Sequence, residues 1–196
     1  ANVAMIVFRL LSSAFVEYSV GNMEVISVNL ESLKQVLSRS KPSDSIILEL
    51  DEEKNKLKIG MRGKTKKNFN LGLIELHEKE QKIPDLKFDS SIDMDSTIFN
   101  DAIEDMGIIS DSVSLCVANG NFLVESIGTT NDGKVEIKNG DETSVKLEGE
   151  KEEVRSKYSV TYLKKILKGG KLTDKVSLKF GQDYPLQIEY KITDKL

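Results

Sequence analysis

SVTYLKKILKGGKLTDKVSLKF, residues 159–180, has a counterpart in NLESLKQVLSRSKPSDSIILEL, residues 29–50, and this repetition indicates how the chain folds. A shift of 130 positions aligns the two without a gap and leaves six residues identical: Leu33, Lys34, Leu37, Lys41, Asp44 and Leu48. A looser third copy, DSTIFNDAIEDMGIISDSVSLCV, occupies residues 95–117. Each copy predicts a short amphipathic helix, a turn ending in Asp, and a strand. Such repeats indicate a fold assembled from equivalent units rather than built around one catalytic pocket.

Bulk composition is that of a globular protein. The 196 residues are 39% hydrophobic and 31% charged, and the net charge is −4. No run of residues approaches the roughly 20 apolar positions that a membrane-spanning helix needs, so no membrane partner is expected. Cys116 is the single cysteine, which rules out an internal disulfide and favours a location inside the cell.

The elements expected between the helices are strands. In the first part of the chain, β-branched and aromatic residues predict strands at 3–10, 15–20, 24–28, 45–50, 56–61 and 67–73. In the second part they predict strands at 88–94, 113–117, 122–126, 134–138, 144–147, 155–160, 175–180 and 186–192. Asn29, Asp95 and Ser159 occupy equivalent places as predicted N-caps of helices, and Gly169 and Gly170 are expected to end the third helix. The pattern predicts an α+β protein with antiparallel sheets and helices on one face.

Residue types that could carry catalysis are sparse. His77, the single histidine, lies in a charged segment at 74–87, and Cys116 reads as a buried strand residue. The sequence holds no CxxC, HxxxH, EF-hand, Walker or dinucleotide-binding motif, so we expect no metal and no cofactor. An acidic cluster around the second helix includes Asp101 and Glu104. It leaves a metal-dependent nuclease open as an alternative, although the polar face of an amphipathic helix explains it more simply.

Basic residues recur at matching positions of the first and third copies. Lys34 matches Lys164, and Lys41 matches Lys171. Repeat symmetry would place such residues on one shared surface. Point charges without interleaved aromatic residues suit the phosphate backbone of duplex DNA and predict weak, sequence-independent, salt-sensitive binding. The candidate DNA-binding residues are Lys34, Arg39, Lys41, Lys164, Lys165, Lys168 and Lys171.

The order of these elements resembles that of the DNA sliding clamps of the proliferating cell nuclear antigen family, in their archaeal form. The motifs closest to the family are SVTYL at 159–163 and FGQDYPLQIEY at 180–190, and the resemblance covers essentially the whole chain. It implies a DNA-clamp fold of two similar domains, three copies of which close into a ring with helices lining the hole. Against the family pattern, we expect the first strand–helix unit and the final strand to be missing. Residues 1–73 would then be the remainder of the first clamp domain, 74–87 the interdomain connector, and 88–196 the second clamp domain.

The resemblance also implies a function and partners. The chain would be a non-enzymatic processivity factor that encircles duplex DNA, works with the chromosomal DNA, and tethers DNA polymerase, flap endonuclease and DNA ligase after a clamp loader opens the ring. An alternative is a subunit of a heterotrimeric or checkpoint-type clamp. Partners would insert a hydrophobic-aromatic peptide into a groove formed by Asn2, Ile83, Pro84, Tyr184 and Pro185. Edge strands at 67–73 and 134–138 would form the subunit interface through Lys67, Phe69, Leu71, Lys134, Val135 and Ile137.

Overall fold

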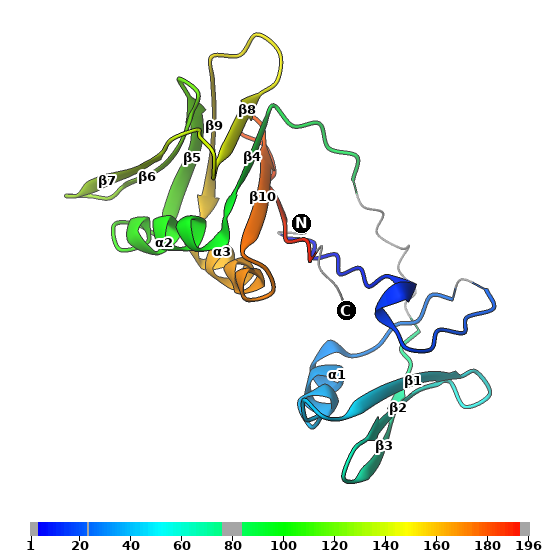
Figure 1. The fold of residues 1–196 in the computed structure, drawn as a ribbon. Coiled ribbons are helices and arrows are strands. Elements are labelled where there is room, and N and C mark those ends of the chain that lie inside the picture. Colours follow the sequence, from blue (N-terminus) through cyan, green and yellow to red (C-terminus); the bar gives the residue numbers. More distant parts are fainter. Residues whose placement is uncertain (1–3, 23, 76–83, 193–196) are drawn as a thin grey trace. The chain divides into compact units, whose positions relative to one another are not determined.

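The computed structural model describes residues 4–22, 24–75 and 84–192. The chain divides into two compact units, Ala1–Ile83 and Pro84–Leu196. In Figure 1 the first unit is coloured from blue to cyan and the second from green to red. No helix in the described residues is long and apolar enough to cross a membrane.

In its described residues, the first unit has one α-helix that packs on one antiparallel sheet. Helix α1 (Leu30–Leu37) precedes strands β1 (Ser45–Asp51), β2 (Lys56–Arg62) and β3 (Lys66–Gly72), which pair in the order β1-β2-β3. The central strand supplies the buried core of the unit, and the apolar side of α1 packs on it. That core consists of Leu57, Ile59 and Met61, with Leu33, Val36, Leu37, Phe69 and Leu71 packed around it.

The three strands predicted before α1 are wrong for the described residues. Within 4–22 and 24–28 the structure has no strand, and its one element is the 3-10 helix η1 (Ser12–Ala14). Ile6 and Phe8 are 84% and 76% exposed. Strand-forming residues make a stable ladder when a neighbouring strand pairs with them, and no described strand pairs with this segment.

The described part of the second unit has two four-stranded antiparallel sheets and two α-helices. One sheet has the order β11-β10-β4-β8 and the other β7-β6-β5-β9. The first contains β4 (Ser90–Asp95), β8 (Ser144–Leu147), β10 (Lys175–Phe180) and β11 (Gln187–Glu189). The second contains β5 (Ser112–Ala118), β6 (Asn121–Ile127), β7 (Asp132–Ile137) and β9 (Glu153–Ser159). Helices α2 (Ser96–Met106) and α3 (Val160–Ile166) connect the two sheets, and the 3-10 helix η2 (Leu167–Lys171) continues α3.

Three fully buried phenylalanines tie these elements together. Phe99 of α2 lies 6.5 Å from Phe122 of β6, and Phe122 lies 6.4 Å from Phe180 of β10, between ring centroids. The aromatic contacts therefore join a helix to both sheets, and they stabilise the unit beyond the area they bury.

All three α-helices of the described residues start directly after their predicted N-cap residues, and two of those residues cap with their side chains. The Asn29 side chain accepts from the Ser32 backbone N–H at 2.9 Å, and Asp95 accepts from that of Thr97 at 2.8 Å. Ser159 is the N-cap residue of α3, so the predicted helix start is confirmed, but its side chain makes no capping hydrogen bond and a side-chain cap at this position is wrong.

The predicted end of the third helix is also wrong, because η2 runs through both glycines to Lys171. A Cβ atom at Gly169 would lie 2.5 Å from the Cδ2 atom of the Tyr190 ring. Glycine therefore serves close packing at this position rather than the end of a helix.

Candidate functional site

The two helices of the second unit form one surface, since α2 and α3 lie side by side (Figure 1). Their contact is close at Gly107, where an added Cβ atom would lie 2.9 Å from Val160 Cγ1 and 3.1 Å from Lys164 Nζ. The Lys164 ammonium group is thus beside the C-terminal end of α2, where the helix dipole favours a positive charge. Part of the role of Lys164 is therefore structural.

The predicted basic residues are all exposed. Four of them, Lys164, Lys165, Lys168 and Lys171, are brought together on α3 and η2, and the other three belong to α1 of the first unit and the turn after it. Lys165 Nζ lies 5.6 Å from the centroid of the Tyr162 ring, a cation–π contact. Among the ion pairs of the described residues, none involves any of the seven. Their charge is therefore not neutralised by carboxylates within the described part of the chain.

The acidic cluster does not assemble a metal centre. Asp101 and Glu104 are exposed on α2, whereas Asp93 accepts from the Ser177 hydroxyl and Asp95 caps the helix. Among the described residues, no three His, Cys, Asp or Glu side chains come together in a way that could hold a metal ion. The geometry thus gives the nuclease alternative no support.

Two of the predicted groove residues lie in the loop at 181–185, which follows β10. The Tyr184 ring meets the Phe88 ring nearly edge-on, with centroids 6.1 Å apart, and Pro185 is exposed beside it. Pro84 is exposed at the start of the second unit. Asn2, Ile83 and His77 lie outside the described residues. The sequence does not single out Phe88 as a groove residue, because its pattern predicts the first residue of a strand there, whereas β4 begins at Ser90.

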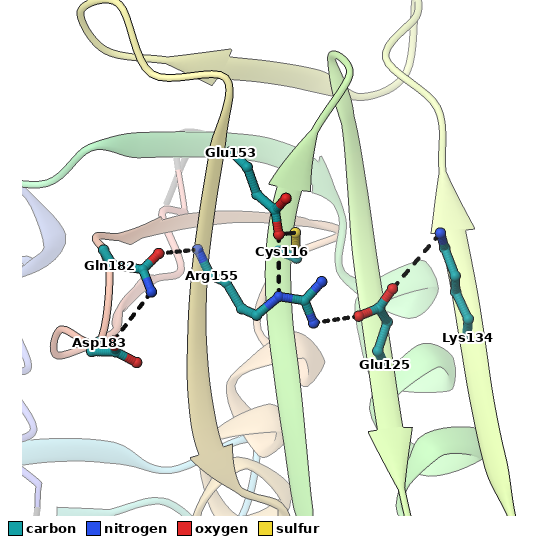
Figure 2. A network of polar contacts seen from close by, with 7 residues as sticks. All are labelled: Cys116, Glu125, Lys134, Glu153, Arg155, Gln182 and Asp183. Carbon is teal, nitrogen blue, oxygen red and sulfur yellow. Dashed lines mark hydrogen bonds and ion pairs between the residues drawn. The ribbon is translucent and has the colours of Figure 1, made fainter.

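The 181–185 loop is hydrogen-bonded along the free edge of β9. The Arg155 backbone N–H donates to Gln182 Oε1 at 2.9 Å, and the Asp183 N–H donates to the Arg155 carbonyl at 3.1 Å. Figure 2 shows the Arg155–Gln182 contact. Ser156 and Tyr158, also on β9, hydrogen-bond to the backbone of Tyr184. Nothing in the sequence identified these two side chains, because the bonds join residues 28 and 26 positions apart.

The opposite side of Arg155 begins a charged network that crosses the same sheet (Figure 2). The guanidinium donates to Glu153 at 3.2 Å and to Glu125 at 2.5 Å, and Glu125 faces Lys134 of β7 at 3.7 Å. The network therefore links β9 through β6 to β7, one of the predicted interface strands. The hydrogen bond to Glu125 raises the pKa of Arg155 above its ordinary value.

Cys116 lies under this network and has the properties of a structural residue. Its thiol donates to Glu153 Oε1 at 3.3 Å. Burial, with a smaller contribution from that hydrogen bond, raises the pKa of Cys116 to about 11. The thiol is therefore protonated near neutral pH and is a poor nucleophile, as the sequence predicted for a buried strand residue.

Both predicted interface strands lie at sheet edges, since β3 ends one sheet and β7 another. Phe69 and Leu71 face the core of the first unit. On the same face, Lys67 Nζ donates to the Arg39 carbonyl at 2.7 Å. On β7, Val135 and Ile137 face the core, while Lys134 alternates to the other face. An edge strand presents unpaired backbone donors and acceptors, so both strands are able to pair with another chain.

Known proteins resemble this chain over its whole length. Residues 1–91 match the proliferating cell nuclear antigen N-terminal domain, and residues 82–196 match the C-terminal domain of the same family. A DNA polymerase sliding clamp of Nanoarchaeum equitans is 33% identical over 100% of this chain and 79% of its own length. One from Pyrococcus horikoshii is 34% identical over 100% of this chain and 78% of its own length.

The structural comparison agrees with these matches. The crystal structure of proliferating cell nuclear antigen from Thermococcus kodakaraensis superposes with a TM-score of 0.80 at 26% identity, covering 92% of this chain and 73% of that one. The resemblance inferred from the order of elements is confirmed, and so is the fold class of antiparallel sheets with a few short helices.

Proposed function

The chain belongs to the proliferating cell nuclear antigen family, and we propose that it acts as a DNA polymerase sliding clamp, a non-enzymatic processivity factor. The observation that carries this function is the match of both clamp domains, in order, across the whole chain. DNA and the enzymes of replication are the partners that this family implies, and the protein works where chromosomal DNA is. We propose no cofactor for the chain itself.

Copies of the chain close into a ring when β3 of one copy pairs with β7 of the next. Support comes from the position of both strands at sheet edges, with apolar side chains on one face of each. Such a contact joins two different surfaces, and a contact of this kind closes a ring when the rotation between copies is right. Three copies form the ring, as the family resemblance implies.

The exposed lysines of the helices face duplex DNA in the hole. Lys165 and Lys168 make no ion pair in the described part of the chain and are free to approach phosphates. Asp101 and Glu104 repel phosphates, so α2 contributes little. Weak contacts suffice because a closed ring is held on DNA by topology and must be able to slide.

Partner enzymes bind through a hydrophobic-aromatic peptide beside Tyr184 and Pro185. A short apolar anchor against a rigid aromatic wall is an effective peptide site. Tethering raises the local concentration of the polymerase, flap endonuclease or ligase at its substrate. A separate ATP-driven loader opens the ring.

The experiment that tests this function compares closed and linear DNA. The chain is loaded by an archaeal clamp loader with ATP onto nicked plasmid circles, and the DNA is separated from free protein by gel filtration. We expect protein to remain on the circles and to be lost when a restriction enzyme linearises them. Equal retention on circular and linear DNA would mean ordinary binding rather than encirclement.

A charge-reversal pair tests the DNA contacts separately. Lys165→Glu with Lys168→Glu removes charge from the helix surface, and the matched control, Lys146→Glu with Lys179→Glu, removes equal charge from exposed strand positions. The helix variant should reduce the salt dependence of duplex binding, by about 0.9 in the log–log slope for each phosphate that it no longer neutralises. Equal effects of both variants would assign the binding to net charge alone.

A further inference from the structure

We propose that Ser156 and Tyr158 of β9 are positioning residues that hold the 181–185 loop, and with it Tyr184, in the conformation that receives a partner peptide. The inference rests on the proposed function, since the peptide site is part of it. Neither side chain belongs to the predicted groove. Ser156 is 3% exposed, so any effect it has on a peptide must pass through the loop.

The two hydroxyl groups hold both polar backbone groups of Tyr184. Ser156 Oγ accepts from the Tyr184 N–H at 3.1 Å and also lies 3.1 Å from the Tyr184 carbonyl oxygen. Tyr158 Oη donates to that same carbonyl at 2.7 Å. A residue whose N–H and C=O are both bound to one strand has little freedom to rotate its peptide planes. The direction of the Tyr184 side chain is therefore set by β9.

The loop needs such anchors because part of its backbone is strained. Asp183 has a φ of 49°, in the left-handed region that a residue with a side chain adopts at a cost. Gly181 is also closely approached, since a Cβ atom there would lie 2.8 Å from Asp89 Oδ2. Strained conformations persist when the surroundings determine them, and here β9 supplies that constraint on one side of the loop.

The environment of Tyr158 suits a permanent donor. Burial raises the pKa of Tyr158 to about 12, so the hydroxyl keeps its proton throughout the physiological range. Its ring packs against Phe180, the last residue of β10, with centroids 6.5 Å apart. Tyr158 is thus fixed by the core at its ring and reaches the loop with its hydroxyl. Because the Tyr158 ring is held by the core, its hydroxyl keeps the loop in a fixed position relative to β9.

Holding Tyr184 in place should affect how tightly the site binds a peptide. On its side-chain end, Tyr184 presents its ring to Phe88, and the pair forms an aromatic wall. A loop that samples other conformations binds a peptide with an affinity reduced by the fraction of molecules that are competent. Releasing Tyr184 from β9 should therefore weaken peptide binding without removing any atom that the peptide touches.

The test uses two variants, each with a matched control in the same unit. Ser156→Ala is compared with Ser126→Ala, which removes an equally buried hydroxyl that bonds the Ser112 carbonyl at 3.0 Å, away from the loop. Tyr158→Phe is compared with Tyr190→Phe, which removes a hydroxyl that has no hydrogen-bond partner among the described residues. Binding of a short fluorescein-labelled hydrophobic-aromatic peptide is followed by fluorescence anisotropy on the full chain. We expect about fivefold weaker binding for Tyr158→Phe and about tenfold for Ser156→Ala, with unchanged binding in both controls.

A second readout separates a failed role from a failed site. Hydrogen–deuterium exchange of the segment that contains residues 182–184 should accelerate in Ser156→Ala and stay unchanged in Ser126→Ala, without any peptide present. If the wild type binds the peptide and both β9 variants, Ser156→Ala and Tyr158→Phe, bind it equally well, the positioning role is overturned and the proposed function is left intact. A wild-type chain that does not bind the peptide would overturn the peptide site and the positioning role together. If Ser126→Ala loses as much thermal stability as Ser156→Ala and also loses peptide binding, the effect is general destabilisation, and the positioning role is refuted.

Discussion

Replacing the N-cap residue by alanine should destabilise the second unit clearly at α2 and only slightly at α3. Asp95 and Ser159 occupy equivalent places in the repeat and in the same unit. The Asp95 carboxylate accepts from the Thr97 N–H at 2.8 Å and from its hydroxyl at 2.6 Å, whereas the Ser159 side chain caps nothing. Loss of a capping side chain costs about 1 kcal/mol. Asp95→Ala should therefore lower the free energy of unfolding of the second unit by about that amount, and Ser159→Ala by a few tenths of it.

The same carboxylate makes this difference depend on pH. Hydrogen bonds from Thr97, chiefly from its hydroxyl, hold the pKa of Asp95 below its ordinary value of 3.8. A carboxylate with a depressed pKa stabilises the fold above its unfolded pKa and loses that contribution as the pH falls through the folded pKa. Asp95→Asn keeps a capping oxygen but cannot titrate. It should match the wild type near neutral pH and lose less stability than the wild type below about pH 4.

Urea unfolding followed by tyrosine fluorescence measures both effects, since Tyr158, Tyr162, Tyr184 and Tyr190 all report on the second unit. The matched pair is decisive because both substitutions remove a polar group at the same repeat position. Equal destabilisation by Asp95→Ala and Ser159→Ala at neutral pH would contradict the capping role of Asp95. So would an Asp95→Asn variant whose stability falls as steeply in acid as that of the wild type.

Three further predictions concern the core, a close contact and the thiol. Phe122→Ala, which removes the middle ring of the buried aromatic trio, should destabilise the second unit by about 3–5 kcal/mol in urea unfolding, and a loss under 1 kcal/mol would contradict that core. Gly169→Ala places a Cβ atom 2.5 Å from the Tyr190 ring and should lower the free energy of unfolding by about 1–3 kcal/mol. The double variant with Tyr190→Ala should remove much of that cost, because the clashing ring is gone. Fully additive effects of the two substitutions would contradict the clash. Cys116, with its pKa raised to about 11, should resist iodoacetamide at pH 8 until urea unfolds the unit, and rapid labelling of the folded chain by mass spectrometry would contradict its burial.

Much of the fold could be predicted from the sequence because the repeat encodes it locally. The spacing of Leu33 and Leu37 places both on one face of α1, and a capping residue with a following turn is a signal a few residues long. The strands that follow each helix were found within a residue or two for the same reason. The segment before α1 shows the limit of this reasoning. Strand-forming residues such as Ile6 and Phe8 predict a strand, but the ladder depends on a partner strand, which a local pattern cannot supply.

The candidate sites divide in a similar way. Exposed lysines of α3 were found because amphipathic periodicity separates the polar face from the apolar one. Lys67 was proposed for the interface, yet its ammonium group hydrogen-bonds to the Arg39 carbonyl within its own unit, a contact between residues 28 positions apart. The anchoring of Tyr184 by Ser156 and Tyr158 is likewise long-range. Such contacts are set by the tertiary fold and leave no pattern in a single sequence.

The absolute mass of the protein in solution shows whether copies of the chain assemble, and a clamp must close a ring of chains. Light scattering after size exclusion, over a hundredfold range of concentration, gives that mass without a shape assumption. We expect a stable species of three times the 21.9 kDa chain at every concentration. A concentration-independent monomer would contradict a ring made from this chain alone, and would leave assembly with a different subunit as the remaining route to a clamp.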